Sequence, residues 1–257
     1  MNRLLWTQTI SKKSSPPWPC SSCREGTFRL VPGSLIYQET VWSKRARNHE
    51  EWDPDWITFS FTAWVKCDNS ACGEEVAVAG DGGIETDYDD EGAGSFHAEY
   101  CSPRFCSPMP DIIEIPGNCP PKVASELRVA FALFWSDPSG AANHIRVALE
   151  ALMSHLRIRE RRKTDKGKFV KLNLHQRIEL FREADLIIGN QLMALKWLGN
   201  TGSHDGGVIQ NDVLAAFEII EHALLELIEQ RSKRLAALAS GLEKKHRPGA
   251  KKHKLPF

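Results

Sequence analysis

The chain lacks any apolar run long enough to cross a bilayer. Its opening residues, MNRLLWTQTISKKSSPP, also lack the hydrophobic stretch and the small-residue cleavage site of a secretory signal. An excess of either charge is absent too, because 33 Lys and Arg balance 33 Asp and Glu. These absences predict a cytoplasmic protein with no membrane partner, and the neutral balance neither favours nor excludes nucleic acid.

What the sequence does show is an uneven distribution of charge. Acidic residues gather in 81–95, whereas basic residues gather in 157–171 and 243–257. Such separation can give one face of a neutral protein a positive potential that attracts phosphate groups. The alternative interpretation is two solvated loops and a frayed terminus.

The cysteines form the clearest motif. Cys20-x2-Cys23 and Cys67-x4-Cys72 are two closely spaced pairs, and each pair lies beside turn-forming residues. Thiolates are good ligands for zinc, and turns direct both sulfurs of a pair at one ion. Disulfides are disfavoured because seven cysteines are an odd number and no signal peptide precedes them. The pattern predicts a structural zinc site, closed by four sulfurs and therefore not catalytic.

Three cysteines remain outside this motif. Cys101 and Cys106 repeat the x4 spacing, and Cys119 has no partner at ligand spacing. We interpret all three as free thiols. A second metal site, with His97 as a substitute ligand, is the alternative.

The two halves of the chain differ in their periodicity. Residues 27–42, 56–67 and 74–82 are rich in β-branched and aromatic residues, which predicts strands, and the acidic segment 81–95 resembles a hairpin tip. From Lys122 the pattern becomes helical, with Ser139 near the expected N-cap of one helix and a last long helix over 211–239. One apolar stripe is expected to face the core: Ile145, Ala148, Leu149, Leu152, Met153 and Leu156.

These patterns predict an α+β protein, in which a small β zinc ribbon precedes an antiparallel α-helical bundle. The expected divisions are a flexible N-terminus (1–16), a zinc-ribbon-like β domain (17–107), a proline-rich connector (108–121), a helical bundle (122–232) and a basic tail (233–257).

One segment of the helical half, 193–207, departs from the pattern around it. Here an apolar helix runs into Gly199, Asn200 and His204. If the helix continues, Lys196, Asn200 and His204 lie at successive i, i+4 positions and share one face. The glycines at 199 and 202 weaken a helix by up to about 1 kcal/mol each, so we expect close approach by a partner helix or a ligand to compensate. A glycine C-cap with an exposed histidine is the alternative.

This segment, LKWLGNTGSHDGG, occurs together with HIRVALEALMSHL, LHQRIELFREAD and DVLAAFEIIEHALLELIE. In this order and spacing they resemble a prokaryotic domain of unknown function that is found beside or fused to restriction enzymes. We place that domain in the HEPN superfamily (higher eukaryotes and prokaryotes nucleotide-binding). The resemblance covers about residues 108–230.

The resemblance implies a possible ribonuclease site. Active members of the superfamily cut RNA without metal through an Arg-x4–6-His motif, in which histidine is the acid/base and arginine stabilises the phosphorane. Asn200 and His204 match this motif, but Gly199 stands where the arginine is expected. Lys196 is one candidate for the missing cation. Arg146 and Glu150 match the family's Arg-x-x-x-Glu stretch.

Two functions follow from the resemblance. The first is a defence-associated module that binds RNA, another nucleic acid or a partner protein, and that forms a homodimer through the face around Lys196–His204. The second is a metal-independent endoribonuclease of a phage-defence or toxin system, with His204 as acid/base. Gly199 favours the first function, and the retained Asn200 and His204 favour the second.

Overall fold

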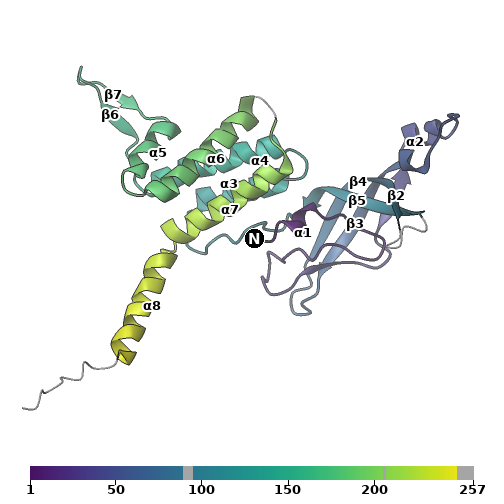
Figure 1. Cartoon of the computed structure of the whole chain (residues 1–257), viewed down its shortest axis with the longest axis horizontal. Coiled ribbons are helices and arrows are strands. Elements are labelled where there is room, and N and C mark those ends of the chain that lie inside the picture. Colours follow the sequence, from purple (N-terminus) through teal and green to yellow (C-terminus); the bar gives the residue numbers. More distant parts are fainter. Residues whose placement is uncertain (89–94, 205–206, 248–257) are drawn as a thin grey trace, which may run out of the picture.

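The computed structural model describes the backbone of residues 1–88, 95–204 and 207–247, and their side chains except those of 87, 88, 95, 96 and 204. It is a mixed α/β structure, with a curled antiparallel sheet in the N-terminal half and several helices in the C-terminal half (Figure 1). In the described part of the chain, no helix has the length and apolar character needed to span a membrane. The tip of the acidic hairpin lies outside the described residues.

The sheet contains five strands, and each predicted strand segment contributes to it. The long central strand β3 pairs with β1 and β2 along one edge and with β4 along the other, and β4 pairs with β5. The strands are β1 (Phe28–Leu30), β2 (Ile36–Glu39), β3 (Thr58–Cys67), β4 (Glu75–Tyr88) and β5 (Ser95–Ser107). Buried and exposed residues alternate along β3, so that Phe61 faces the core while Trp64 lies on the open face.

Short helices accompany the sheet: α1 (Leu4–Thr7), α2 (Val41–Ala46) and the 3₁₀ turn η1 (Pro54–Trp56). Helix α2 ends the predicted strand segment 27–42 early. The reason is local, because the Thr40 hydroxyl accepts a hydrogen bond from the Ser43 amide at 3.2 Å and caps the helix.

As far as residue 247, and leaving out 205–206, the C-terminal half contains six helices and one small hairpin: α3 (Pro121–Leu133), α4 (Pro138–His155), β6 (Arg161–Lys163), β7 (Phe169–Lys171), α5 (Leu174–Arg182), α6 (Leu186–His204), α7 (Gln210–Leu227) and α8 (Arg231–His246). The predicted apolar stripe of α4 is buried, apart from the partly buried Leu156. Helix α8 projects away from the others (Figure 1), and none of its residues is buried.

The structure defines one predicted helix limit more closely and contradicts another. The N-cap of α4 is Asp137, whose carboxylate accepts a hydrogen bond from the Gly140 amide at 2.8 Å, with Pro138 in the first helical position. The single helix predicted over 211–239 is two helices, because Gln230 has a left-handed φ of 52° and breaks the chain direction between α7 and α8.

The N-terminal segment, which we expected to be flexible, is packed. Trp6 and Ile10 are buried, and Ile10 pairs with Cys101 at the edge of β5. Trp6, Trp18 and Trp135 form an aromatic cluster with ring centroids 5.2–6.3 Å apart. Because Trp135 follows α3, this cluster joins the sheet to the helices, and the Trp135 indole N–H donates to the Trp6 carbonyl at 3.1 Å.

Candidate functional site

The four predicted ligand cysteines lie together. The Sγ atoms of Cys20 and Cys72 are 3.8 Å apart, those of Cys23 and Cys67 are 3.7 Å apart, and all four lie within 4.8 Å of one another. A disulfide would require about 2.05 Å. The arrangement is therefore one of four free thiols around a common centre, compatible with a metal site.

Backbone amides stabilise negative charge on this cluster. The N–H groups of Glu25 and then Gly26 donate toward the Cys23 sulfur and lower the pKa of that thiol to about 6. Burial has the opposite effect on Cys67 and raises its pKa to about 12. Four neighbouring thiolates repel one another, so all four thiols can ionise together only if a positive charge lies between them. The cluster is in this respect compatible with a metal site.

The remaining cysteines do not join this cluster. Cys101 and Cys106 are buried on β5, and burial raises their pKa values to about 11 and 12. Among the residues that the structure describes, no second group of three or more Cys, His, Asp or Glu side chains gathers its ligand atoms in this way. Cys119, which follows the sheet, is partly buried.

A second candidate site lies between α4, α6 and the start of α5. Helix α6 continues through both glycines to His204, and a close helix crossing explains them. A Cβ atom at Gly199 would lie 2.5 Å from the Arg146 Cβ and 2.9 Å from the Ala142 carbonyl, while one at Gly202 would lie 2.5 Å from the Ser139 carbonyl. The expected close approach is therefore made by α4 of the same chain.

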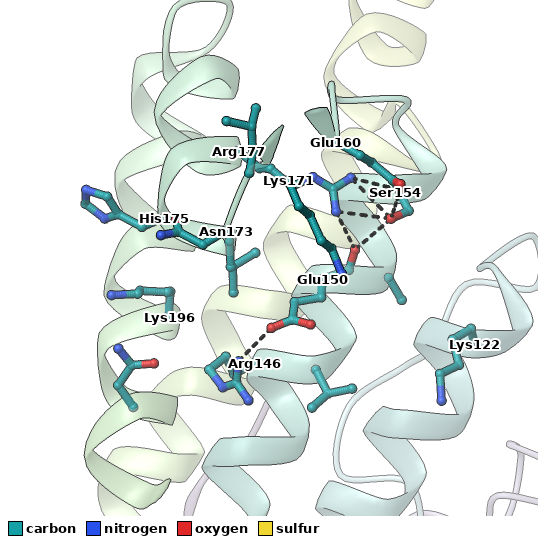
Figure 2. Close-up of a pocket in the computed structure, with 15 residues that line it drawn as sticks. Lys122, Arg146, Glu150, Ser154, Glu160, Lys171, Asn173, His175, Arg177 and Lys196 are labelled. Atoms are coloured by element: carbon teal, nitrogen blue, oxygen red, sulfur yellow. Dashed lines mark hydrogen bonds and ion pairs between the residues drawn. The ribbon is translucent and has the colours of Figure 1, made fainter. Parts of the chain in front are cut away.

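Hydrogen bonds fix this crossing. The Asn143 amide oxygen accepts from the Arg146 Nε and Nη2 at 3.2 and 3.1 Å, and from the Ser203 hydroxyl at 3.0 Å. The Arg146 Nη1 also donates to Glu150 at 2.6 Å (Figure 2). Arg146 is thus held by two residues of its own helix, directly over Gly199 of the neighbouring one.

The crossing forms one side of an open cleft of about 860 Å³. Four residues predicted from the sequence line it together: Arg146, Glu150, Lys196 and Asn200. The lining contains five basic side chains (Lys122, Arg146, Lys171, Arg177, Lys196) against two carboxylates (Glu150, Glu160). The side chain of His204, the fifth predicted residue, lies outside the described part of the structure.

Lys196 lies in an unusual environment for a lysine. Only 8% of its surface is exposed, and its ammonium lies 3.2 Å from the centroid of the Trp197 ring. Burial, and secondly the positive charge of Arg146, lower the pKa of this ammonium below its ordinary value. An anion bound in the cleft would offset both effects, because it stabilises the charged form.

The sequence did not identify the opposite wall of the cleft. Basic segment 157–171 forms the β6–β7 hairpin, and Lys171 reaches from β7 toward Glu150 (Figure 2). The base of the hairpin is fixed by the buried Arg177, which donates to the Ser154 hydroxyl and the Ile158 carbonyl, both at 3.1 Å. The Nε of Arg177 has no partner among the described residues. In the sequence, the only indication of this wall was the high density of basic residues in 157–171.

Two family models match the chain. One is described as a domain of unknown function (DUF8608) and matches residues 8–107, and the other, also a domain of unknown function (DUF4145), matches residues 128–245. Each covers less than half of the chain, and neither description names an activity. No curated protein and no solved structure matches the chain.

The α4–α6 crossing yields a prediction on stability. Alanine at Gly199 favours the helix by up to about 1 kcal/mol, but overpacking against Arg146 and Ala142 costs about 1–3 kcal/mol. We expect Gly199→Ala to lower the free energy of unfolding by about 1–2 kcal/mol in urea titrations. Gly241→Ala is the matched control, because this glycine also lies within a helix, α8, and no atom lies within 4 Å of a Cβ there. A stabilised Gly199→Ala protein would contradict the close crossing.

Proposed function

We propose that the cleft binds the phosphate groups of nucleic acid, and that the protein is a HEPN-like, defence-associated binding module. The observation that carries the proposal is the excess of basic side chains lining one open cleft, five against two carboxylates. Phosphate contacts from Lys and Arg supply most of the affinity of proteins for nucleic acid, independently of sequence. A cleft with low-dielectric walls also concentrates the attraction of such charges.

The surroundings of the cleft support the same proposal. The hairpin beside it carries further exposed cations, at Arg161, Arg162 and Lys163 on β6 and at Lys166 and Lys168 in the turn before β7. The first turn of α5 also lines the cleft, and the N-terminal end of a helix favours anions. Asn200 adds an uncharged polar side chain to the same lining, where it can position a phosphate or a ribose.

The proposal predicts a loss of affinity in cleft variants. Lys171→Ala and Arg146→Ala should weaken binding to a labelled 20-nucleotide RNA, and each should reduce the slope of log K against log salt by about 0.7–0.9 per lost phosphate contact. Fluorescence anisotropy over a salt series measures both quantities. Lys66→Ala is the control, since this exposed lysine lies on β3, away from the cleft. Equal effects of Lys171→Ala and Lys66→Ala would reject the cleft as the binding site.

We also propose that the cysteine cluster binds a structural zinc ion. Four sulfurs at about 2.3 Å from a tetrahedrally coordinated zinc lie about 3.8 Å apart, and the measured pairs are 3.8 and 3.7 Å apart. Four protein ligands leave no position for substrate, so the ion would hold the fold together without taking part in chemistry. Its charge would stabilise all four thiolates at once.

Metal analysis tests this assignment. The purified protein should contain about one zinc per chain, and Cys20→Ser or Cys67→Ser should lose it. Cys101→Ser should retain it, since that thiol lies outside the cluster. Chelation should unfold the N-terminal half first, because metal binding and folding are coupled in such sites. Retention of zinc by Cys20→Ser, or its loss from Cys101→Ser, would contradict the assignment.

The second candidate function is a metal-independent endoribonuclease, and one observation favours it. In the resembled motif the arginine belongs at Gly199, and Arg146 packs directly over that glycine, within 2.5 Å of where a Cβ would be. The aliphatic part of Arg146 therefore lies where a side chain at 199 would begin, and its guanidinium ends in the lining of the same cleft, beside Asn143 and Glu150. Unlike Lys196, it provides a planar group that can bind two phosphate oxygens at once.

Incubation with total RNA in EDTA tests this alternative. If the protein is a nuclease, wild type should cut RNA and leave 2′,3′-cyclic phosphate ends, whereas His204→Ala should be inactive. Arg146→Ala should lower the rate by about 10²–10³, as expected for a group that stabilises charge in the transition state, and Lys196→Ala should also weaken cutting. If wild type and His204→Ala are equally inert and still bind RNA, the binding-module function stands alone.

A homodimer, or a complex with a partner protein of a defence system, remains part of the proposal. This part of the proposal rests on the resemblance alone. Gly199 and Gly202, which also suggested a close partner, pack against α4 of the same chain. A two-fold dimer through the face around Lys196 would place two clefts near one axis.

A further inference from the structure

Trp197 is the one large aromatic side chain that α6 exposes beside the cleft in the described structure. It follows Lys196 and precedes Asn200 by one helical turn, and both of these residues line the cleft. More than half of its surface, 55%, is open to solvent. By contrast, the tryptophans that join the sheet to the helices, Trp6, Trp18 and Trp135, are buried. Packing in the core therefore does not account for Trp197.

The ring is held in place from two directions. The Lys196 ammonium lies 3.2 Å from its centroid, and the His175 ring approaches edge-on with centroids 5.8 Å apart. His175 is itself positioned by Met193, with 3.2 Å between Nδ1 and the sulfur. Lys196 and His175 lie on the same flank of the cleft (Figure 2). A ring fixed in this way loses little conformational freedom when a flat ligand stacks on it.

We propose that Trp197 is a stacking platform for an unpaired nucleobase whose backbone phosphate lies in the basic cleft; this inference rests on the proposed function. A tryptophan ring with a cation over one face is polarised, and bases stack on aromatic rings whatever their identity. Inside a duplex both faces of each base are already stacked. An unpaired base has a free face anywhere along a strand, whereas a duplex offers one only at its ends, so this subsite should favour single strands.

The β6–β7 hairpin offers a path along which a single-stranded nucleic acid can leave the cleft. Lys171 at the end of β7 lines the cleft, and Phe169, two residues before it on the same strand, is 70% exposed. A single strand that leaves the cleft along this hairpin would meet cations for its phosphates and a second aromatic ring for a base. Basic side chains and exposed aromatic rings therefore lie along the same path. Proteins that bind single strands without reading their sequence combine phosphate contacts and base stacking in this way.

The test compares a 12-nucleotide single-stranded RNA with the blunt duplex of the same sequence, by fluorescence anisotropy on the full chain. Trp197→Ala should weaken binding of the single strand about 5- to 100-fold, since one stacked base is lost. Its slope of log K against log salt should be unchanged, because no phosphate contact is removed. Trp197→Phe should retain most of the affinity. Trp42→Ala is the matched control, an exposed tryptophan on α2 of the sheet half.

The outcomes separate this inference from the proposed function. Binding that depends on Lys171 but is unaffected by Trp197→Ala, or that favours the duplex, overturns the stacking platform and leaves the cleft intact. An equal loss in Trp42→Ala and Trp197→Ala also overturns it. No binding of either RNA by wild type overturns both proposals. Because more than half of Trp197 is exposed, its variants should remain folded in urea titrations, and a Trp197→Ala protein that is unfolded without urea would contradict the proposed surface role.

Discussion

The close crossing of α4 and α6 determines the geometry of the candidate site. Glycine at 199 and 202 allows the two backbones to approach to a distance that a Cβ atom would prevent. Asn143 then accepts hydrogen bonds from Arg146 on its own helix and from Ser203 on the other. This crossing brings Arg146 next to Asn200, although more than fifty residues separate them in the chain. A looser contact would leave the same side chains on separate surfaces.

In the N-terminal half, the cysteine cluster and the tryptophan cluster are connected by a very short piece of chain. Trp18 lies two residues before Cys20, and its indole N–H donates to the Leu5 carbonyl at 2.7 Å. A metal that holds Cys20 to Cys72 would therefore also hold Trp18 against Trp135, at the junction with the helices. The cysteines take no part in the cleft, but a metal bound by them would stabilise the region of the N-terminal half that contacts the helices.

The distribution of charge connects these features to the proposed function. The chain is neutral overall, yet the cleft and the β6–β7 hairpin concentrate positive charge. The buried Arg177 contributes to this in two ways, because it lines the cleft and anchors the hairpin through the Ile158 carbonyl. On a neutral protein, a basic cleft gives a local positive potential that attracts phosphate groups, which is the property that the proposed function requires.

Local patterns in the sequence were sufficient for several features. Alternation predicted β3, helical periodicity predicted the buried face of α4 around Leu149, and the spacing of the cysteines, from Cys20 to Cys72, predicted a cluster. These succeed because each depends on residues close in the chain or on a ligand type with strong spacing preferences. The i, i+4 relation of Lys196 and Asn200 is of the same kind.

Only the tertiary structure decided what the remaining residues contact. Periodicity cannot show that α4 fills the space at Gly199, that Arg177 supports a hairpin, or that Trp197 stays exposed while Trp6 is buried. Each of these depends on which surfaces meet across long separations in the chain. The free energy of such contacts comes from shape and burial, which no single segment of sequence contains.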